Sequence, residues 1–274
     1  MAKATGWRLF VRSVIGRSYP RIIGVQRLKS GLFFDVVLPL IGLSAYVFVY
    51  RAIHAPEAFV GFVVLGGAMS SFWLNVLWAM SNQFFWEREN GNLALYIMAP
   101  CPMTAILLGM AIGGIVVASL RAVAIVTIGS LLFHVHYAVA SAPMLVVVFV
   151  LGLTALYGMG MMFASVFLLF GRGAWHLVSL SQEPVYLVSG MYFPIRSLGF
   201  WTAAAASLIP LTLALDAMRQ LVFSSDAGIG FLDVGAEAAI LLALTGVFLV
   251  GARFMLAYVE RLAIGEGTLT ESRG

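Results

Sequence analysis

Charged side chains are scarce in this chain. Asp, Glu, Lys and Arg make up 10% of its 274 residues, whereas 62% are hydrophobic. Soluble domains carry about 25% charged residues. The mean hydropathy of +1.00 points the same way. The composition therefore excludes an ordinary soluble domain and indicates an integral membrane protein.

Cysteine and the motifs of several enzyme classes are also missing. Cys101 is the single cysteine, so the chain forms no internal disulfide and a metal cluster is not expected. His134 and His136 share a predicted loop, but two histidines do not make a zinc site. The closest approach to a phosphate-binding loop, at residues 24–30, lacks the glycine before its lysine. We therefore expect no catalytic residue, no metal and no ATP site on this chain.

Long apolar runs are abundant. About 20 apolar residues cross a hydrocarbon core roughly 30 Å thick, because a helix rises about 1.5 Å per residue. The runs are continuous rather than alternating, which favours helices over barrel strands. The sequence predicts an all-α membrane protein with six transmembrane helices, at residues 32–50, 58–80, 103–132, 143–170, 174–191 and 236–258.

Positive residues are unevenly distributed over this six-span layout. Twelve of the 16 Lys and Arg precede the first span or fall in segments that alternate crossings place on the same side. Arg51, Arg196 and Arg219 fall on the other side. By the positive-inside rule, both termini are predicted to be cytoplasmic. The net charge of +4 then reflects anchoring at the inner face rather than nucleic-acid binding.

The first 30 residues are predicted to form a cytoplasmic amphipathic interface helix, followed by a transmembrane domain at residues 31–274. Apolar residues recur at helical spacing on one face, and two arginines lie one turn apart on another face. Pro20 is expected to end or bend this helix. The helix is either a lipid anchor or a docking surface for a partner. Its predicted functional residues are Trp7, Arg8, Phe10, Val11, Arg12, Val14 and Ile15.

A polar segment interrupts the chain between the second and third spans. Glu87, Arg88 and Glu89 fit one helical turn that is broken near Gly91, which predicts a short knob projecting from the membrane. A plain charged loop is the alternative. The other predicted cytoplasmic loop, at residues 171–173, is very short, so this segment is the only sizeable cytoplasmic surface expected between spans. It comprises Trp86, Glu87, Arg88, Glu89, Asn90, Gly91, Asn92 and Leu93.

The segment at residues 193–207 is apolar but too short to cross the membrane twice. We predict a re-entrant helical hairpin near the outer face, because a chain that dips into the membrane must satisfy its backbone groups internally. Such a hairpin suits an outer gate. The alternative is a surface loop held by aromatic anchors at the membrane interface. The gate candidates are Tyr192, Phe193, Pro194 and Trp201.

Polar and aromatic residues at membrane depth are candidates for a transport pathway. Glu183 directly precedes Pro184 in the fifth span, where it faces water, contacts a cationic group or pairs with Arg121. The aromatic residues of the second span either line a conduit or face lipid. Gly109 with Gly113, and Gly160 with Ala164, have the spacing for close helix packing. The pathway candidates are Phe72, Trp73, Asn75, Glu183 and Tyr186.

Two stretches resemble type-2 ATP-binding-cassette (ABC) exporter permeases, and the similarity extends over essentially the whole chain. Residues 86–93, with Ala99-Pro100 and 106–109 behind them, resemble the cytoplasmic coupling segment of that family. Residues 189–198 and 209–219 resemble its sequence from the fifth span to the outer loop. Asn92 stands where the family more often has Thr, and Ile209 stands where it more often has Asn. These two differences weaken the assignment to a subfamily more than the assignment to the family.

The resemblance implies a non-catalytic membrane subunit of an ATP-driven exporter. Two copies, or this chain and a sister permease, would form the pathway, and two ATP-binding subunits beneath it would hold ATP and Mg²⁺. Residues 86–93 would form a coupling helix in a groove of the ATPase. A drug or lipid is the expected substrate, with a polysaccharide or glycolipid as the alternative. A stand-alone secondary transporter is less expected, and an intramembrane enzyme least.

The source and location also follow from composition. The chain is rich in Ala and Gly and favours Arg over Lys, which indicates a GC-rich bacterial genome. We therefore expect a multi-pass protein of the bacterial plasma membrane.

Overall fold

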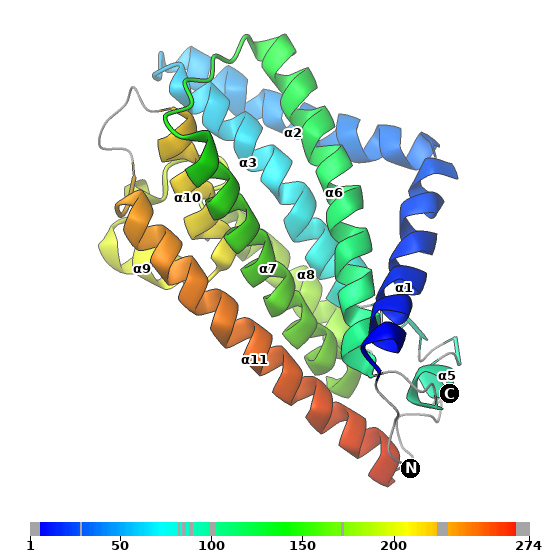
Figure 1. Cartoon of the computed structure of the whole chain (residues 1–274). Helices are drawn as coiled ribbons and strands as arrows, with labels where there is room; N and C mark the ends of the chain where they lie inside the picture. Colours follow the sequence, from blue (N-terminus) through cyan, green and yellow to red (C-terminus); the bar gives the residue numbers. More distant parts are fainter. Residues whose placement is uncertain are drawn as a thin grey trace.

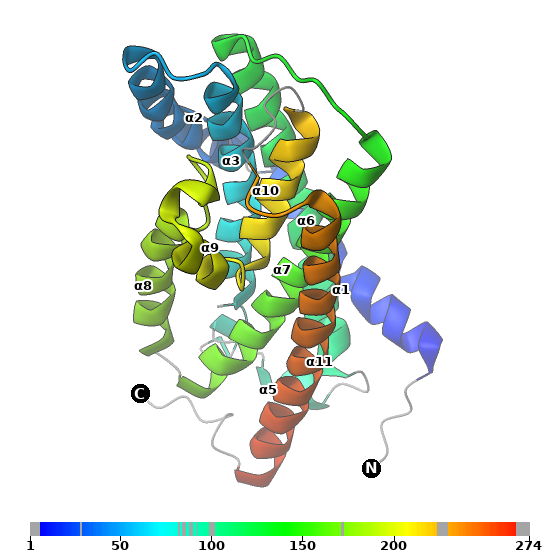
Figure 2. The same ribbon diagram turned by 90° about the vertical axis from the view of Figure 1, so that its left-hand side faces the viewer.

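The computed structural model describes residues 6–27, 29–81, 83, 86–87, 90–91, 93–98, 102–170, 173–223 and 230–266. This part of the chain is helical almost throughout and contains no β-strand, which confirms the predicted all-α class. Figures 1 and 2 show the helices in two views. In chain order they are α1 (Trp7–Arg27), α2 (Lys29–Ala52), α3 (Ala58–Leu74), the π-helix η1 (Asn75–Ser81), α5 (Leu93–Met98), α6 (Met103–Phe133), α7 (Ala142–Phe170), α8 (Gly173–Val188), the 3-10 helix η2 (Ile195–Leu198), α9 (Phe200–Ala206), α10 (Pro210–Val222) and α11 (Val234–Glu266).

The bundle is built around α3. Of an 18-residue window in the span formed by α3 and η1, 94% is buried, against 17% for α11. The central helix packs against α6, α2 and α10, while α7 packs against α10 and α11. Helix α11 lies along the outside of the bundle (Figure 1). A helix that is apolar but mostly exposed, as α11 is, suits contact with lipid.

Five helices of the described chain are long and apolar enough to cross a membrane, and the bent pair of α9 and α10 makes a sixth if it counts as one span. The predicted fifth span is shorter than expected. Helix α8 has 16 residues, or about 24 Å, which is less than the roughly 30 Å of a hydrocarbon core. It ends before Gly190, whose φ of +67° turns the chain away from the helix axis.

The segment after α8 forms a bent helical pair. Helix α9 turns by 112° into α10. Pro210 begins α10 at a position where the missing N–H costs nothing. The bent pair overlaps residues 193–207, where a re-entrant hairpin was expected, but its buried arm, α10, lies beyond that range. The bend fits a broken span as well as a re-entrant loop, so the hairpin stays a prediction. The sequence hid this arm because Asp216 and Arg219 make it look like an outer loop.

Helix α1 packs along α6 (Figures 1 and 2). Two glycines of α6 let the helices meet, because a Cβ at Gly109 would lie 2.6 Å from the Val14 carbonyl oxygen and one at Gly113 would lie 3.1 Å from the Ser18 oxygen. The close packing predicted for this glycine pair is therefore confirmed, with α1 as the partner. Pro20 is exposed, and α1 continues through it to Arg27. Of the two predicted effects of Pro20, ending the helix is therefore wrong, and bending it stays a prediction.

The second small-residue pair also mediates close packing. A Cβ at Gly160 of α7 would lie 2.7 Å from Cγ1 of Val76 in η1, and Ala164 is fully buried. Helix α7 and the π-helix therefore approach each other more closely than larger side chains would allow, as the spacing predicted.

Candidate functional site

The predicted coupling segment lies against α1 through a buried carboxylate. Glu87 is 7% exposed and accepts hydrogen bonds from the guanidinium of Arg17 and, at 2.9 Å, from Nε2 of Gln83. The Arg17 guanidinium also lies 5.3 Å from the ring centre of Tyr96 in α5. Three separate segments therefore meet at one ion pair.

The tyrosine of this cluster is held in its neutral form. Burial raises the pKa of Tyr96, Arg17 lowers it, and the charge and hydrogen bond of Glu87 raise it again. Charge-assisted hydrogen bonds of this kind are roughly twice as strong as neutral ones. The cluster of Arg17, Glu87 and Tyr96 is called the α1 clasp below.

Four residues of the predicted coupling segment, Trp86, Glu87, Asn90 and Gly91, are described together with the backbone of Leu93. The Asn90 N–H donates to the Trp86 carbonyl oxygen at 2.9 Å, and Gly91 has a φ of +74°. Trp86 is 48% exposed. Arg88, Glu89 and Asn92 lie outside the described residues, as does the side chain of Leu93. The helical turn of Glu87, Arg88 and Glu89 therefore stays a prediction, as does the role of the segment in coupling.

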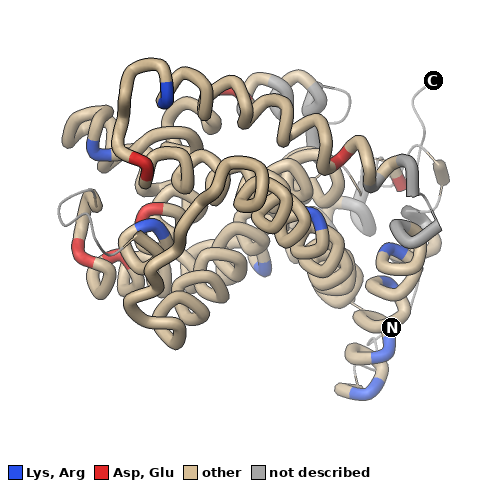
Figure 3. Tube along the Cα trace, turned by 90° about the horizontal axis from the view of Figure 1, so that it is seen from above, with Lys and Arg blue, Asp and Glu red and all other residues tan. Residues whose placement is uncertain are grey.

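The predicted interface helix divides its apolar residues between two faces. Val14 is buried against α6, whereas Trp7 is 76% and Ile15 58% exposed. The rings of Trp7 and Phe10 stack with centroids 5.9 Å apart. Positive residues recur along this helix (Figure 3). An exposed apolar stripe beside basic residues is the pattern of a helix at a membrane surface.

Tyrosines from α2 and α8 contact the loop that follows α8. The ring of Tyr192 stacks on Tyr46 at 4.1 Å and on Tyr186 at 6.2 Å between centroids. The Tyr50 hydroxyl donates to the Tyr192 carbonyl oxygen at 2.9 Å. Burial, with Tyr46 and Glu183 nearby, raises the pKa of Tyr192 to about 12, so its phenol stays neutral. We call Tyr46, Tyr50, Tyr186 and Tyr192 the tyrosine stack.

Sequence reasoning identified half of the tyrosine stack. Tyr186 and Tyr192 were predicted as a pathway and a gate residue, and the structure brings them together. Tyr46 and Tyr50 were missed. Their spacing of four residues places both on one face of α2, which is a usable signal.

Arg219 of α10 fixes the same loop from inside the bundle. Its Nη1 donates to the carbonyl oxygens of Gly190 at 2.5 Å and Phe193 at 3.2 Å. Its Nη2 donates to Met191 at 2.6 Å and to Phe62 of α3 at 2.9 Å. The guanidinium is buried and lies 5.0 Å from the Phe62 ring centre. A buried cation is tolerated here because carbonyl oxygens surround it.

The loop also needs a glycine on α3. A Cβ at Gly66 would lie 1.6 Å from the Met191 carbonyl oxygen, so no larger residue fits beneath the loop. Pro194 starts η2, while Trp201 of α9 is 83% exposed and meets Phe200 edge to face at 5.4 Å. The predicted gate residues therefore do not form one cluster. Trp201 has the exposure expected of an aromatic anchor.

The pathway candidates are dispersed. Phe72 and Trp73 are each 1% exposed, so neither faces lipid. Asn75 is buried and accepts a hydrogen bond from the Tyr157 hydroxyl at 3.1 Å. Glu183 is exposed on α8 and accepts from Gln182 at 3.3 Å. These residues do not line one channel within a single copy of the chain.

Arg121 pairs with α2 rather than with α8. Its Nη2 lies 2.5 Å from a carboxylate oxygen of Asp35. The considered pair with Glu183 is therefore wrong. The sequence alone does not predict Asp35 as the partner of Arg121. Asp35 lies in the first turn of the predicted first span, where a charged residue is expected to mark the end of a span rather than an ion pair.

An apolar cleft of about 310 Å³ opens between α3, α6 and α7. Phe72 contributes its ring, which meets Phe149 edge to face at 5.7 Å, and the exposed Val123 stands at the opening. The polar lining is restricted to Ser119 and Thr127. The full lining is Leu65, Ala68, Met69, Phe72, Ser119, Ala122, Val123, Val126, Thr127, Phe149 and Met218.

Comparison with known proteins gives one match. Residues 14–223 match the family model described as ABC-2 type transporter. The match begins in α1 and ends just after α10, so it includes the α1 clasp, the tyrosine stack and Arg219. A search of curated proteins gives no match.

Proposed function

The chain belongs to the ABC-2 type transporter family, and from that premise we propose that it is the permease subunit of an ATP-driven exporter. Two copies, or this chain with a sister permease, enclose the pathway. Two ATP-binding subunits dock beneath them and supply ATP and Mg²⁺. The assembly lies in a bacterial plasma membrane with both termini cytoplasmic, as the distribution of Lys and Arg supports.

The observation that carries this proposal is the α1 clasp. Residues 86–93 form the coupling segment, and the Arg17–Glu87 ion pair ties that segment to α1. Helix α1 in turn packs on α6 at Gly109 and Gly113. A push on the coupling segment therefore reaches α6 through rigid contacts. The pair is partly buried, with the Arg17 side chain 27% exposed, so removing one partner costs less than the about 3–5 kcal/mol of a fully buried pair but more than at an open surface.

A hydrophobic or amphipathic substrate, such as a drug or lipid, is the class that the side chains support. The cleft between α3, α6 and α7 is almost wholly apolar. A polysaccharide or glycolipid was the alternative because Phe72 and Trp73 offered stacking faces. Both rings are buried within the bundle, which favours the apolar substrate over the sugar.

The outer gate is the tyrosine stack, and the pathway runs along the exposed faces of α2 and α8. Leu38 and Ile41 of α2 are each 62% exposed, and Leu187 of α8 is also 62% exposed. Glu183 lies on α8 one turn before Tyr186. A carboxylate on an apolar helix avoids lipid, so this face meets water or the second permease.

Exchanging the charges of the clasp tests the proposal. The chain is placed in lipid nanodiscs with the ATP-binding protein encoded beside it, and ATP hydrolysis and substrate movement are measured. We expect Arg17→Glu and Glu87→Arg each to uncouple hydrolysis from transport, because each leaves two like charges together. The double variant restores the pair and most of the coupling.

Arg261→Glu is the control, because Arg261 is an exposed arginine of α11 that belongs neither to α1 nor to residues 86–93. It should leave coupling unchanged. Wild-type coupling in both single clasp variants would refute the role of the clasp. Transport by the chain without any ATP-binding protein would overturn the exporter and favour a secondary transporter.

A further inference from the structure

A pocket of about 630 Å³ lies between the connection from α2 to α3 and the connection from α6 to α7. These connections are at the end of the bundle away from the start of α1 and the end of α11 (Figure 1). The pocket is distinct from the α1 clasp, the tyrosine stack and the apolar cleft. It is lined by Arg51, His54, Ala55, Pro56, Glu57, Ala58, Val60, Phe133, His134, Val135, His136 and Phe223.

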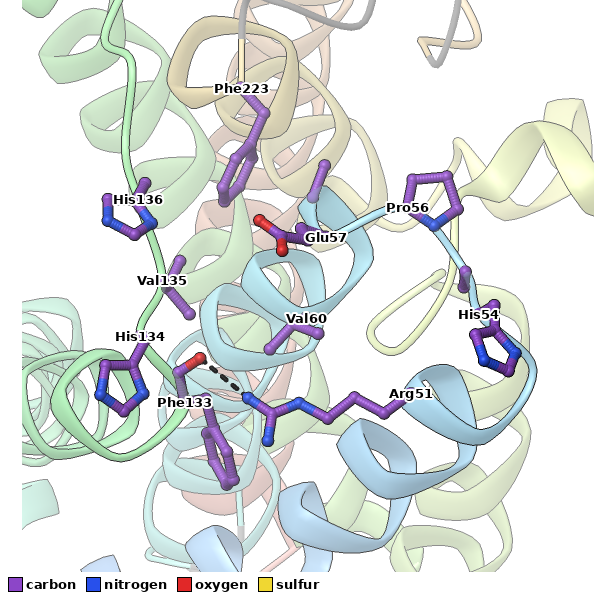
Figure 4. Close-up of a pocket in the computed structure, with 12 residues that line it drawn as sticks. Arg51, His54, Pro56, Glu57, Val60, Phe133, His134, Val135, His136 and Phe223 are labelled. Atoms are coloured by element: carbon purple, nitrogen blue, oxygen red, sulfur yellow. Dashed lines mark hydrogen bonds between the residues drawn. The ribbon is translucent and has the colours of Figure 1, made fainter.

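The lining is rich in nitrogen donors. Figure 4 shows the Arg51 guanidinium between His134 and His136 on one wall and His54 on the other. Glu57 is the single carboxylate in the lining. Three of the four histidines of the chain therefore gather around one arginine.

The guanidinium of Arg51 is fixed in place and retains free donors. Its Nη2 donates to the Phe133 carbonyl oxygen at 3.1 Å. Arg51 forms no ion pair within the described part of the chain. An arginine has five N–H donors, so most of them remain available to a ligand.

Two of the histidines occupy an uncommon backbone conformation. His54 has a φ of +52° and His134 a φ of +58°, and these are the two non-glycine residues with positive φ in the described chain. Glycine adopts this conformation more readily than a side chain does. Both residues close the C-terminal end of a helix, α2 or α6, where this conformation is a common cap, and the two caps bring the imidazoles to the pocket.

The walls of the pocket are pinned to α10. The N–H groups of Ala138 and Ala140 donate to the carbonyl oxygens of Val222 at 2.9 Å and Leu221 at 2.8 Å. The Phe223 ring packs on Phe62 with centroids 5.2 Å apart. The pocket is therefore preformed, as binding sites for small molecules usually are.

We propose that this pocket binds a phosphate-bearing molecule from the side of the membrane opposite the start of α1 and the end of α11. Arg51 supplies the fixed positive charge and a planar pair of donors that matches phosphate oxygens. The imidazoles of His134 and His136 add donors from one wall. Val60, Val135 and Phe223 give the pocket an apolar side, which suits the carbon part of a phosphate ester.

A metal ion is not the favoured occupant. In the described residues no three His, Cys, Asp or Glu side chains converge in a way that could hold one. The phosphate comes either from a lipid headgroup or from a soluble ester, and the two sources share the chemistry that Arg51 recognises. This site does not depend on the export function proposed above.

Binding to the full chain in dodecyl maltoside, a detergent without phosphate, tests the proposal, with glycerol 3-phosphate as the soluble probe and ³¹P line broadening as the readout. Arg51→Gln keeps a polar side chain with N–H donors but removes the charge. We expect this variant to weaken binding about tenfold or more, since it loses charge-assisted hydrogen bonds. Arg51→Lys should retain part of the affinity.

Arg196→Gln is the control, because Arg196 is exposed on η2 away from the pocket lining. It should bind as the wild type does. Circular dichroism and gel filtration establish that Arg51→Gln is folded. A second arm measures retention of phosphatidylglycerol by native mass spectrometry. Retention that falls with Arg51→Gln identifies a lipid headgroup, whereas loss of glycerol phosphate binding alone identifies a soluble ester.

Two results would overturn the proposal. One is a wild-type chain that binds neither probe. The other is a folded Arg51→Gln variant that binds both probes as tightly as the wild type.

Discussion

Arg219 is the residue on which the loop after α8 depends. Its two terminal nitrogens satisfy four carbonyl oxygens from the loop and α3. Such a cation cannot be replaced by a smaller side chain without leaving buried oxygens unpaired. The loop also carries Tyr192, so Arg219 fixes the position of the loop and of the tyrosine stack together.

Truncation at this position should be costly. We expect Arg219→Ala to lower the free energy of unfolding by about 3 kcal/mol or more, because several buried carbonyls lose a charged donor. The free energy of unfolding of Arg219→Lys should fall between those of the wild type and Arg219→Ala, because an ammonium group has three donors but not the planar arrangement of a guanidinium. Thermal unfolding of the detergent-solubilised chain measures this. A wild-type midpoint for Arg219→Ala would show that water replaces the guanidinium.

At the scale of helices, the junction of α1 and α6 offers a sharp test of packing. A Cβ at Gly109 would lie 2.6 Å from a backbone oxygen of α1, which a helix cannot move aside. We expect Gly109→Ala to destabilise docking of α1 by about 1–3 kcal/mol and to expose its arginines to trypsin.

Gly42→Ala in α2 is the control, because a Cβ there has nothing within 4 Å. Equal trypsin cleavage of the two variants would mean that α1 already separates from α6 in the wild type.

The helices also show what sequence can and cannot predict. Apolar runs predicted α3, α6, α7 and α11 well, because length and hydropathy suffice for a spanning helix. They overextended α8, since its end depends on a turn at Gly190, and they missed α10, whose Asp216 and Arg219 are buried through contacts with distant segments. A polar residue satisfied by tertiary structure looks the same in sequence as an exposed one.

The sequence also predicted only part of the candidate site. Residues 86–93 stood out because they are polar between two apolar runs. Their partner could not be foreseen, because Arg17 lies 70 residues earlier in the chain and was one arginine among several on the same helix. Likewise the pocket around Arg51 joins two loops whose histidines look unrelated until the helices bring them together.

At the scale of the whole molecule, two exposed apolar surfaces are available to the second permease that we propose. Ile41 on α2 and Val247 on α11 are both 62% exposed. The face of α2 lies on the side of the tyrosine stack and the exposed Glu183, which disfavours lipid there. We therefore expect α2 to face the second copy and α11 to face the bilayer.

Cross-linking distinguishes the two faces. In a Cys101→Ser background, which removes the single cysteine, Ile41→Cys should form a disulfide-linked dimer under mild oxidation. Val247→Cys should remain monomeric on a non-reducing gel. The reverse pattern would place α11 at the interface between copies and leave α2 and α8 facing lipid.

The docking of α1 also sets an order of events during synthesis. Its partners Glu87 and Gly109 leave the ribosome at least 70 residues after it, which takes several seconds at roughly 5–20 residues per second. During that interval the arginines of α1 have no carboxylate from residues 86–93 to meet. Anionic lipid headgroups attract such basic segments. We therefore expect the newly made helix to lie on the membrane surface first and to pack against α6 and residues 86–93 only after the third span is inserted.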